Sequence, residues 1–234
     1  MARQHKRRRT LGKQQTQHTY NVPRHTVSKH VLSNRARLPR RDERLPFIPP
    51  EDWHEPDDGD GYRIVHQPPG KGYRHVVTPA EVRDRLADLP PQFVAPLEVV
   101  QLSRMTRKKQ SFPCYGMQWG AALYLYPLET ELVEHYHRPP RPEQVIEARM
   151  YGGRWQEPGD GTWRLIWTER TIKDFYLNNI LIHELGHLLD ERNSSYTDRE
   201  RWAEWFAVEF GYKSNHPLRS RPKKQKTRRR HHSA

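Results

Sequence analysis

Cysteine is nearly absent from this chain of 234 residues, which contains only Cys114. One thiol cannot form an intrachain disulfide, and the cysteine pairs of a zinc finger are missing. No apolar run is long enough to span a membrane, and the basic N-terminus lacks the apolar segment of a secretory signal. These absences favour a cytoplasmic protein, with an organellar transit peptide as the alternative.

Acidic residues are scarce at both ends of the chain. Residues 1–45 contain 13 Lys/Arg and 2 acids, and residues 213–234 contain 9 Lys/Arg and no acid, so a net charge of +13 leaves −7 for residues 46–212. Segments so charged and so poor in apolar residues cannot offset their chain entropy by burial. We therefore expect a disordered basic tail and acidic linker over 1–60, a folded domain over 61–212, and a second disordered tail over 213–234.

Clustered cations favour weak, sequence-independent binding to nucleic acid through counterion release. The chain has no base-reading module, so specific recognition of a nucleotide sequence is not indicated. The tails predict association with nucleic acid, the nucleoid, ribosomes or another polyanion, and simple solubilisation is the alternative.

The most informative pattern is HELGH, residues 183–187. Two histidines four residues apart on a helix share one face, so both imidazoles can reach one metal ion. The glutamate between them lies about 100° round the helix, close enough to act on a metal-bound water without being a ligand. The pattern predicts His183 and His187 as zinc ligands and Glu184 as general base.

The surrounding residues predict a helix over 171–191, with Thr171 as its N-cap and Asp174 in its first turn. Its apolar residues point in nearly every direction, which is typical of a helix buried on most sides. Unliganded histidines would be costly there, although core histidines with hydrogen-bond partners are the alternative. Gly186 inside a helix predicts a close neighbour at that point.

Catalytic zinc usually takes three protein ligands. The metzincin continuation is excluded because Asp190 and Asn193 stand where that class has glycine and histidine, and the next histidine is His216, in the basic tail. A carboxylate is therefore the better candidate for the third ligand.

A second helix is predicted over 197–212, and its small residues allow a close approach to the first helix. Glu200 is our candidate for the third ligand. Its alternative role is a capping box with Thr197, and Glu204, one turn later, is the fallback ligand or an acceptor that orients a ligating histidine.

The rest of the domain reads as α+β. A helix is expected from Thr78 to about Leu89, because Pro79 follows a capping threonine. Strands are expected over 97–102 and 121–126, then a helix over 142–150, and finally a hairpin of 151–156 and 162–167 around a turn at 157–161.

The HELGH segment and the later Glu-Arg-Trp-Ala-Glu of residues 200–204 resemble gluzincin-type zinc metallopeptidases, and in particular the small soluble phage-repressor-processing and radiation-response peptidases. The resemblance implies a zincin-like domain with a small, twisted, mostly antiparallel sheet and an edge strand near 164–167 that holds the substrate. It also implies zinc bound by His183, His187 and Glu200, with Glu184 as general base.

Two functions follow as hypotheses. The first is zinc-dependent hydrolysis of a protein or peptide, with Tyr196, Tyr212 and His216 as candidates for stabilising the oxyanion. In one form of this hypothesis the basic tails direct the enzyme to nucleoprotein substrates. The alternative is a non-catalytic protein that binds nucleic acid or ribosomes, in which HELGH holds a structural metal or none.

Overall fold

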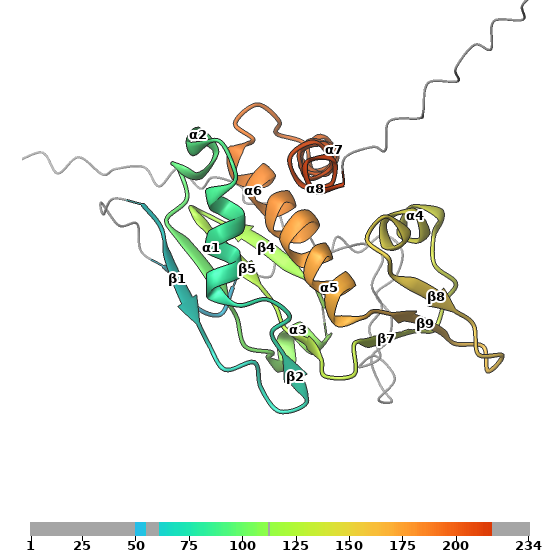
Figure 1. The fold of residues 1–234 in the computed structure, drawn as a ribbon. Helices are drawn as coiled ribbons and strands as arrows, with labels where there is room; N and C mark the ends of the chain where they lie inside the picture. Colours follow the sequence, from blue (N-terminus) through green and yellow to red (C-terminus); the bar gives the residue numbers. More distant parts are fainter. Residues whose placement is uncertain (1–49, 55–60, 112, 217–234) are drawn as a thin grey trace, which may run out of the picture.

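The computed structural model describes residues 50–54, 61–111 and 113–216 (Figure 1). Most of the two predicted tails lies outside the described residues, as does the part of the predicted linker at 55–60. Of the segments predicted to be disordered, the structure describes only 50–54 and 213–216. Within the described residues the chain is an α+β protein with three small sheets. No helix in this described part has both the length and the apolar character needed to cross a membrane.

The largest sheet has the order β1-β3-β5-β4. Its strands are β1 (Arg63–His66), β3 (Val99–Leu102), β5 (Ala122–Leu125) and β4 (Gly116–Trp119). The first two pairings are parallel and only β4 runs antiparallel to its neighbour. The expectation of a mostly antiparallel sheet is therefore wrong for this sheet. Long connections from β1 to β3 and from β3 to β5, each of which contains helix, return the chain to the same end of the sheet and so allow parallel pairing.

The other two sheets are antiparallel. One pairs β2 (Tyr73–Arg74) with β6 (Leu128–Glu129), and the other has β9 (Trp163–Ile166) between β7 (Val133–Tyr136) and β8 (Arg154–Gln156). The β8–β9 hairpin confirms the predicted turn. However, β9 is a central strand with both edges paired, so the prediction of a substrate-holding edge near 164–167 is wrong.

Helix α1 (Pro79–Ala87) begins as its sequence predicts. The Thr78 side chain accepts from the Glu81 backbone N–H, and the Glu81 carboxylate accepts from the Thr78 backbone N–H. This reciprocal capping satisfies two backbone donors that the first turn leaves unpaired. The predicted helix α4 (Pro142–Met150) is also present, and two short helices complete this half of the chain: α2 (Pro91–Val94) and α3 (Arg107–Ser111).

The HELGH segment belongs to a continuous helical rod. The rod consists of α5 (Glu169–Phe175), the π-helical turn η2 (Tyr176–Ile180) and α6 (Leu181–Leu189). Its N-cap is Thr168, whose hydroxyl accepts from the Thr171 backbone N–H, so the prediction of Thr171 as N-cap is wrong by one turn. Both threonines are competent caps, and the rod begins at the first one after β9.

A second rod follows after a short turn. It consists of α7 (Tyr196–Phe206), the π-helical turn η3 (Ala207–Tyr212) and α8 (Lys213–Asn215). The predicted helix over 197–212 is confirmed, but the helical chain continues three residues into the stretch assigned to the basic tail. The His216 imidazole pairs there with the Asp174 carboxylate at 2.9 Å, which ties this end to the first rod.

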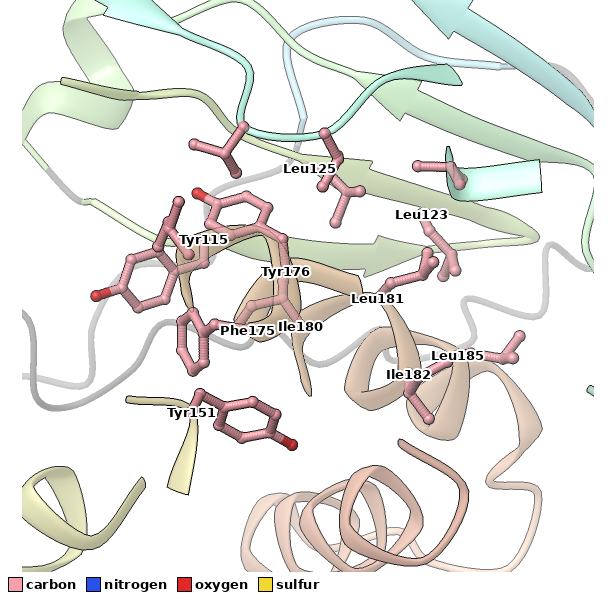
Figure 2. Close-up of a cluster of buried hydrophobic side chains, with 14 of the residues drawn as sticks. Tyr115, Leu123, Leu125, Tyr151, Phe175, Tyr176, Ile180, Leu181, Ile182 and Leu185 are labelled. Atoms are coloured by element: carbon pink, nitrogen blue, oxygen red, sulfur yellow. The ribbon is translucent and has the colours of Figure 1, made fainter. Parts of the chain in front are cut away.

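The main core lies between the largest sheet and the first rod, and Figure 2 shows Leu123 and Leu125 from β5 facing the aromatic and aliphatic side chains of that rod. A smaller cluster, which includes Met117 and Tyr124, covers the opposite face of the same sheet. Part of the predicted linker packs there: the Tyr124 hydroxyl donates to the Asp52 carbonyl, and Trp53 lies edge-on against Trp119. Residues 50–54 thus belong to the folded unit.

A carboxylate on β7 titrates in an unusual range. Glu134 accepts hydrogen bonds from the hydroxyls of Tyr115 and Tyr136 and from the Trp167 indole N–H. Desolvation nevertheless dominates and raises the pKa of Glu134 from 4.5 to about 7. The Glu134 carboxyl therefore stays protonated to a higher pH in the folded protein than in the unfolded chain.

Because the folded pKa of Glu134 is raised, its contribution to stability is complete below the unfolded pKa of 4.5 and is lost as pH rises through about 7. We expect Glu134→Gln to remove this loss. Urea unfolding at about pH 5 and about pH 8 should show the wild type losing about 1–3 kcal/mol relative to the variant. An identical pH dependence in the two proteins would contradict the assignment.

Candidate metal centre

Helix α6 places the HELGH side chains in a water-poor environment. The relative exposure of His183 is 6%, that of His187 1% and that of Glu184 0%. The residues from Leu181 to His187 are all buried, as the apolar pattern predicts for a helix enclosed on most sides. Polar side chains at this depth need specific partners, because burial without them is costly.

Helix α7 packs directly against α6. A Cβ atom at Gly186 would lie 3.1 Å from the Ala203 Cα and 3.1 Å from the Phe206 Cβ, so glycine permits the close approach that the sequence predicts. The Trp202 indole N–H donates to the Gly186 carbonyl, and the Arg199 guanidinium donates to the His187 carbonyl. These contacts bind the end of α6 to the first turns of α7.

Glu200 is free of the capping role that was its alternative. The N-cap of α7 is Ser195, whose hydroxyl accepts from the Asp198 backbone N–H. The capping box that the sequence allows between Thr197 and Glu200 is therefore not formed. Glu200 instead lies over α6, with Oε2 3.7 Å from the His183 Nε2 and Oε1 3.4 Å from the His187 Nε2.

The two imidazoles and the Glu200 carboxylate face one another, and we call these three groups the triangle. The His183 and His187 Nε2 atoms are 3.1 Å apart, and one ligand atom from each of the three residues lies within 4.8 Å of the others. Tetrahedral zinc with ligand bonds of about 2.0–2.1 Å requires ligand atoms about 3.3 Å apart. The two Nε2 atoms are 3.1 Å apart, and each has a different Glu200 oxygen within 3.4 or 3.7 Å, so the three side chains are close enough to share one ion.

The protonation of the group is consistent with a cation site. Burial lowers the pKa of His187 below its usual value, whereas at His183 the hydrogen bond and charge of Glu200 outweigh burial and raise the pKa. Despite burial, the two imidazoles lower the pKa of Glu200 to about 2. An ionised carboxylate beside two imidazole nitrogens is the set of ligand forms that a metal cation requires.

Strand β4 brings the edge of the largest sheet to Glu184. A Cβ atom at Gly116 would lie 2.9 Å from the Glu184 Oε1 and 2.7 Å from the Ile180 Cγ2, so only glycine lets the strand pass this close. Among the described strands, β4 is the terminal strand of its sheet. This strand was not among those predicted, although the alternation of Met117 and Trp119 with smaller or polar residues is a strand signal.

Acidic side chains from two helices flank the triangle. The Asn179 amide on η2 donates to the Glu147 carboxylate on α4 at 2.7 Å. Desolvation raises the pKa of Glu204, the nearby His183 charge opposes that rise, and Glu200 and Glu143 add to it. Glu204 is exposed and is not one of the three converging donors, so the fallback ligand lies at the rim. We call Glu143, Glu147 and Glu204 the acidic rim.

The three residues predicted as candidates for stabilising the oxyanion lie in different places relative to the triangle. Tyr212 and His216 stack on each other, and His216 pairs with Asp174, about 13 Å before His183 along the helix axis. Neither is therefore brought to the triangle. Tyr196 lies one turn before Glu200, on the same side of α7.

Searches of protein-family models, of curated proteins and of solved structures found no match for this chain. The described residues thus define an α+β protein whose two packed helical rods bring together a buried His–His–Glu group able to hold a metal ion.

Proposed function

We propose that this chain is a zinc-dependent peptidase. The proposal rests on one observation above all: the Nε2 atoms of the two imidazoles lie 3.1 Å apart, and each has an oxygen of the Glu200 carboxylate within 3.7 Å. In this proposal His183, His187 and Glu200 hold the ion. A zinc ion there would act as a Lewis acid, polarising the scissile carbonyl and acidifying water.

The protein's own groups would then carry the proton transfers. Glu184 is buried beside the triangle but is not a member of it, as a general base requires. It would accept a proton from the attacking water and donate it to the leaving amide nitrogen. Burial of this carboxylate excludes competing solvent and strengthens its electrostatic interactions.

Strand β4 would hold the substrate. An extended peptide can add to an exposed sheet edge through main-chain hydrogen bonds. The terminal strand next to Glu184 is β4, so this role passes to it from the strand near 164–167. A peptide paired with β4 would run past the catalytic carboxylate.

The function is tested by incubating the full chain with a peptide library and identifying new termini by mass spectrometry. We expect cleavage with zinc, its loss with a zinc chelator, and its return when zinc is restored. Two results would contradict the proposal: cleavage that continues unchanged in the presence of the chelator, or no cleavage by a protein shown to contain zinc. No described contact favours nucleic-acid binding, and the tails on which that alternative rests lie outside the described residues.

The acidic rim predicts a preference for cationic peptides. Charge of one sign around a partly desolvated cleft raises the local concentration of oppositely charged substrate. We expect a short capped peptide with several arginines to show a KM about five- to tenfold lower than its citrulline counterpart, which has nearly the same shape without the charge. The difference should shrink in high salt and in the double variant Glu143→Gln, Glu147→Gln. Equal KM values at low salt would contradict this prediction.

A further inference from the structure

Gln118 on β4 is a buried amide with one unused end. The residue is 3% exposed, and its Nε2 donates to the Gly120 carbonyl at 2.6 Å. Its Oε1 is buried and has no hydrogen-bond partner within the part of the chain that the structure describes. The bond to Gly120 fixes the orientation of the amide, so the acceptor has a defined direction.

The strand geometry places this acceptor on the catalytic side of the sheet. Gly116 pairs with Leu125 and Gln118 with Leu123, and directly paired residues project from the same face. Leu123 and Leu125 face the first rod in Figure 2, and Gly116 contacts Glu184. Gln118 therefore projects toward α6, about 7 Å along the strand from Gly116.

An unused buried acceptor is unfavourable for folding alone. Leaving one polar group without a partner costs more than the net gain of an ordinary hydrogen bond, and an apolar side chain of similar size avoids that loss. Gln101, on β3, shows how this sheet treats a buried glutamine with a structural role. Its Oε1 lies 2.7 Å from the His54 Nε2 and its Nε2 donates to the Ser103 hydroxyl, so both of its ends are used.

We propose that Gln118 is a positioning residue for the substrate, whose Oε1 accepts a main-chain N–H of the peptide held along β4, on the side that faces Glu184. The inference rests on the proposed peptidase function and adds to it a residue that sets the register of the peptide. An acceptor two residues from Gly116 would fix which peptide bond lies opposite the general base.

The test compares Gln118→Met with Gln101→Met in the full-length chain. Both changes remove a buried amide and keep the approximate side-chain volume. For Gln118→Met we expect KM for the arginine peptide to rise about tenfold, the effect of one lost hydrogen bond, with kcat changed less than about twofold. Zinc content and thermal stability should not fall. Gln101→Met should lower thermal stability and leave KM unchanged.

A binding measurement separates this inference from the function itself. In the Glu184→Gln background, Gln118→Met should weaken binding of the fluorescein-labelled arginine peptide about tenfold, as measured by fluorescence anisotropy. Equal binding by the two proteins, binding by neither of them, or a loss of stability like that of Gln101→Met would overturn the role of Gln118. Lack of turnover by zinc-loaded wild type, with the binding difference preserved, would instead count against the peptidase function.

Discussion

Glu184→Gln is expected to keep the metal and to reduce peptide hydrolysis by about three orders of magnitude or more. The substitution preserves the size of a side chain that is 0% exposed, and it removes the group that accepts and returns the proton. General acid–base catalysis contributes about 10²–10⁴-fold to rate, and here one carboxylate serves both proton transfers. Zinc content and single-turnover cleavage of the same peptide measure the two parts of this prediction.

Glu209→Gln is a matched control for this change. Glu209 lies on η3, and its carboxylate pairs with Lys213 on the same helical rod, away from the triangle. The control should retain wild-type turnover. Full activity in Glu184→Gln would exclude the proposed base, and loss of zinc from that variant would show that the carboxylate serves the metal instead.

Loss of zinc from the ligand variants is the second large effect. The wild type should contain one zinc per chain, whereas His183→Ala, His187→Ala and Glu200→Ala should each bind zinc at least about a hundredfold more weakly. Three donors complete a catalytic zinc site, so removal of any one leaves too few protein ligands to retain the ion. Mass spectrometry of the metal content and competition with a chelator measure both quantities.

Glu204→Ala distinguishes the ligand from its neighbour one turn away. Glu204 is at the rim and outside the converging group, so this variant should retain zinc. Zinc retained by Glu200→Ala and lost from Glu204→Ala would assign the third ligand to Glu204. Zinc binding should also raise the melting temperature of wild type and Glu204→Ala but not that of Glu200→Ala, because only a folded site binds the ion.

Local features of the fold could be predicted because neighbouring residues carry them. Thr78 with Pro79 marks the start of α1, and the Gly-containing turn at 157–161 marks the β8–β9 hairpin. Strand pairing was less accessible. The parallel pairing of β1 with β3, and the central place of β9, depend on contacts between segments far apart in the chain.

The helix starts show how limited local information is. Thr168 and Thr171 are both suitable caps, as are Ser195 and Thr197; Thr171 was the predicted cap of the first helix, and Thr197 was only the alternative to the ligand role of Glu200. The fold uses the first residue of each pair, Thr168 and Ser195, because the preceding strand or turn ends there. At α7 this choice has a chemical consequence, since it frees Glu200 from the capping box and leaves it to face the histidines.

By itself, the sequence determined that His183 and His187 share a helix face with Glu184 beside them, because helical periodicity is a property of adjacent turns. Only the tertiary structure decided the rest of the site. Antiparallel packing of α7 on α6 brings Glu200 rather than Glu204 to the imidazoles, and the terminal position of β4 brings Gln118 to the same region. Such juxtapositions depend on how whole elements pack, which no local pattern encodes.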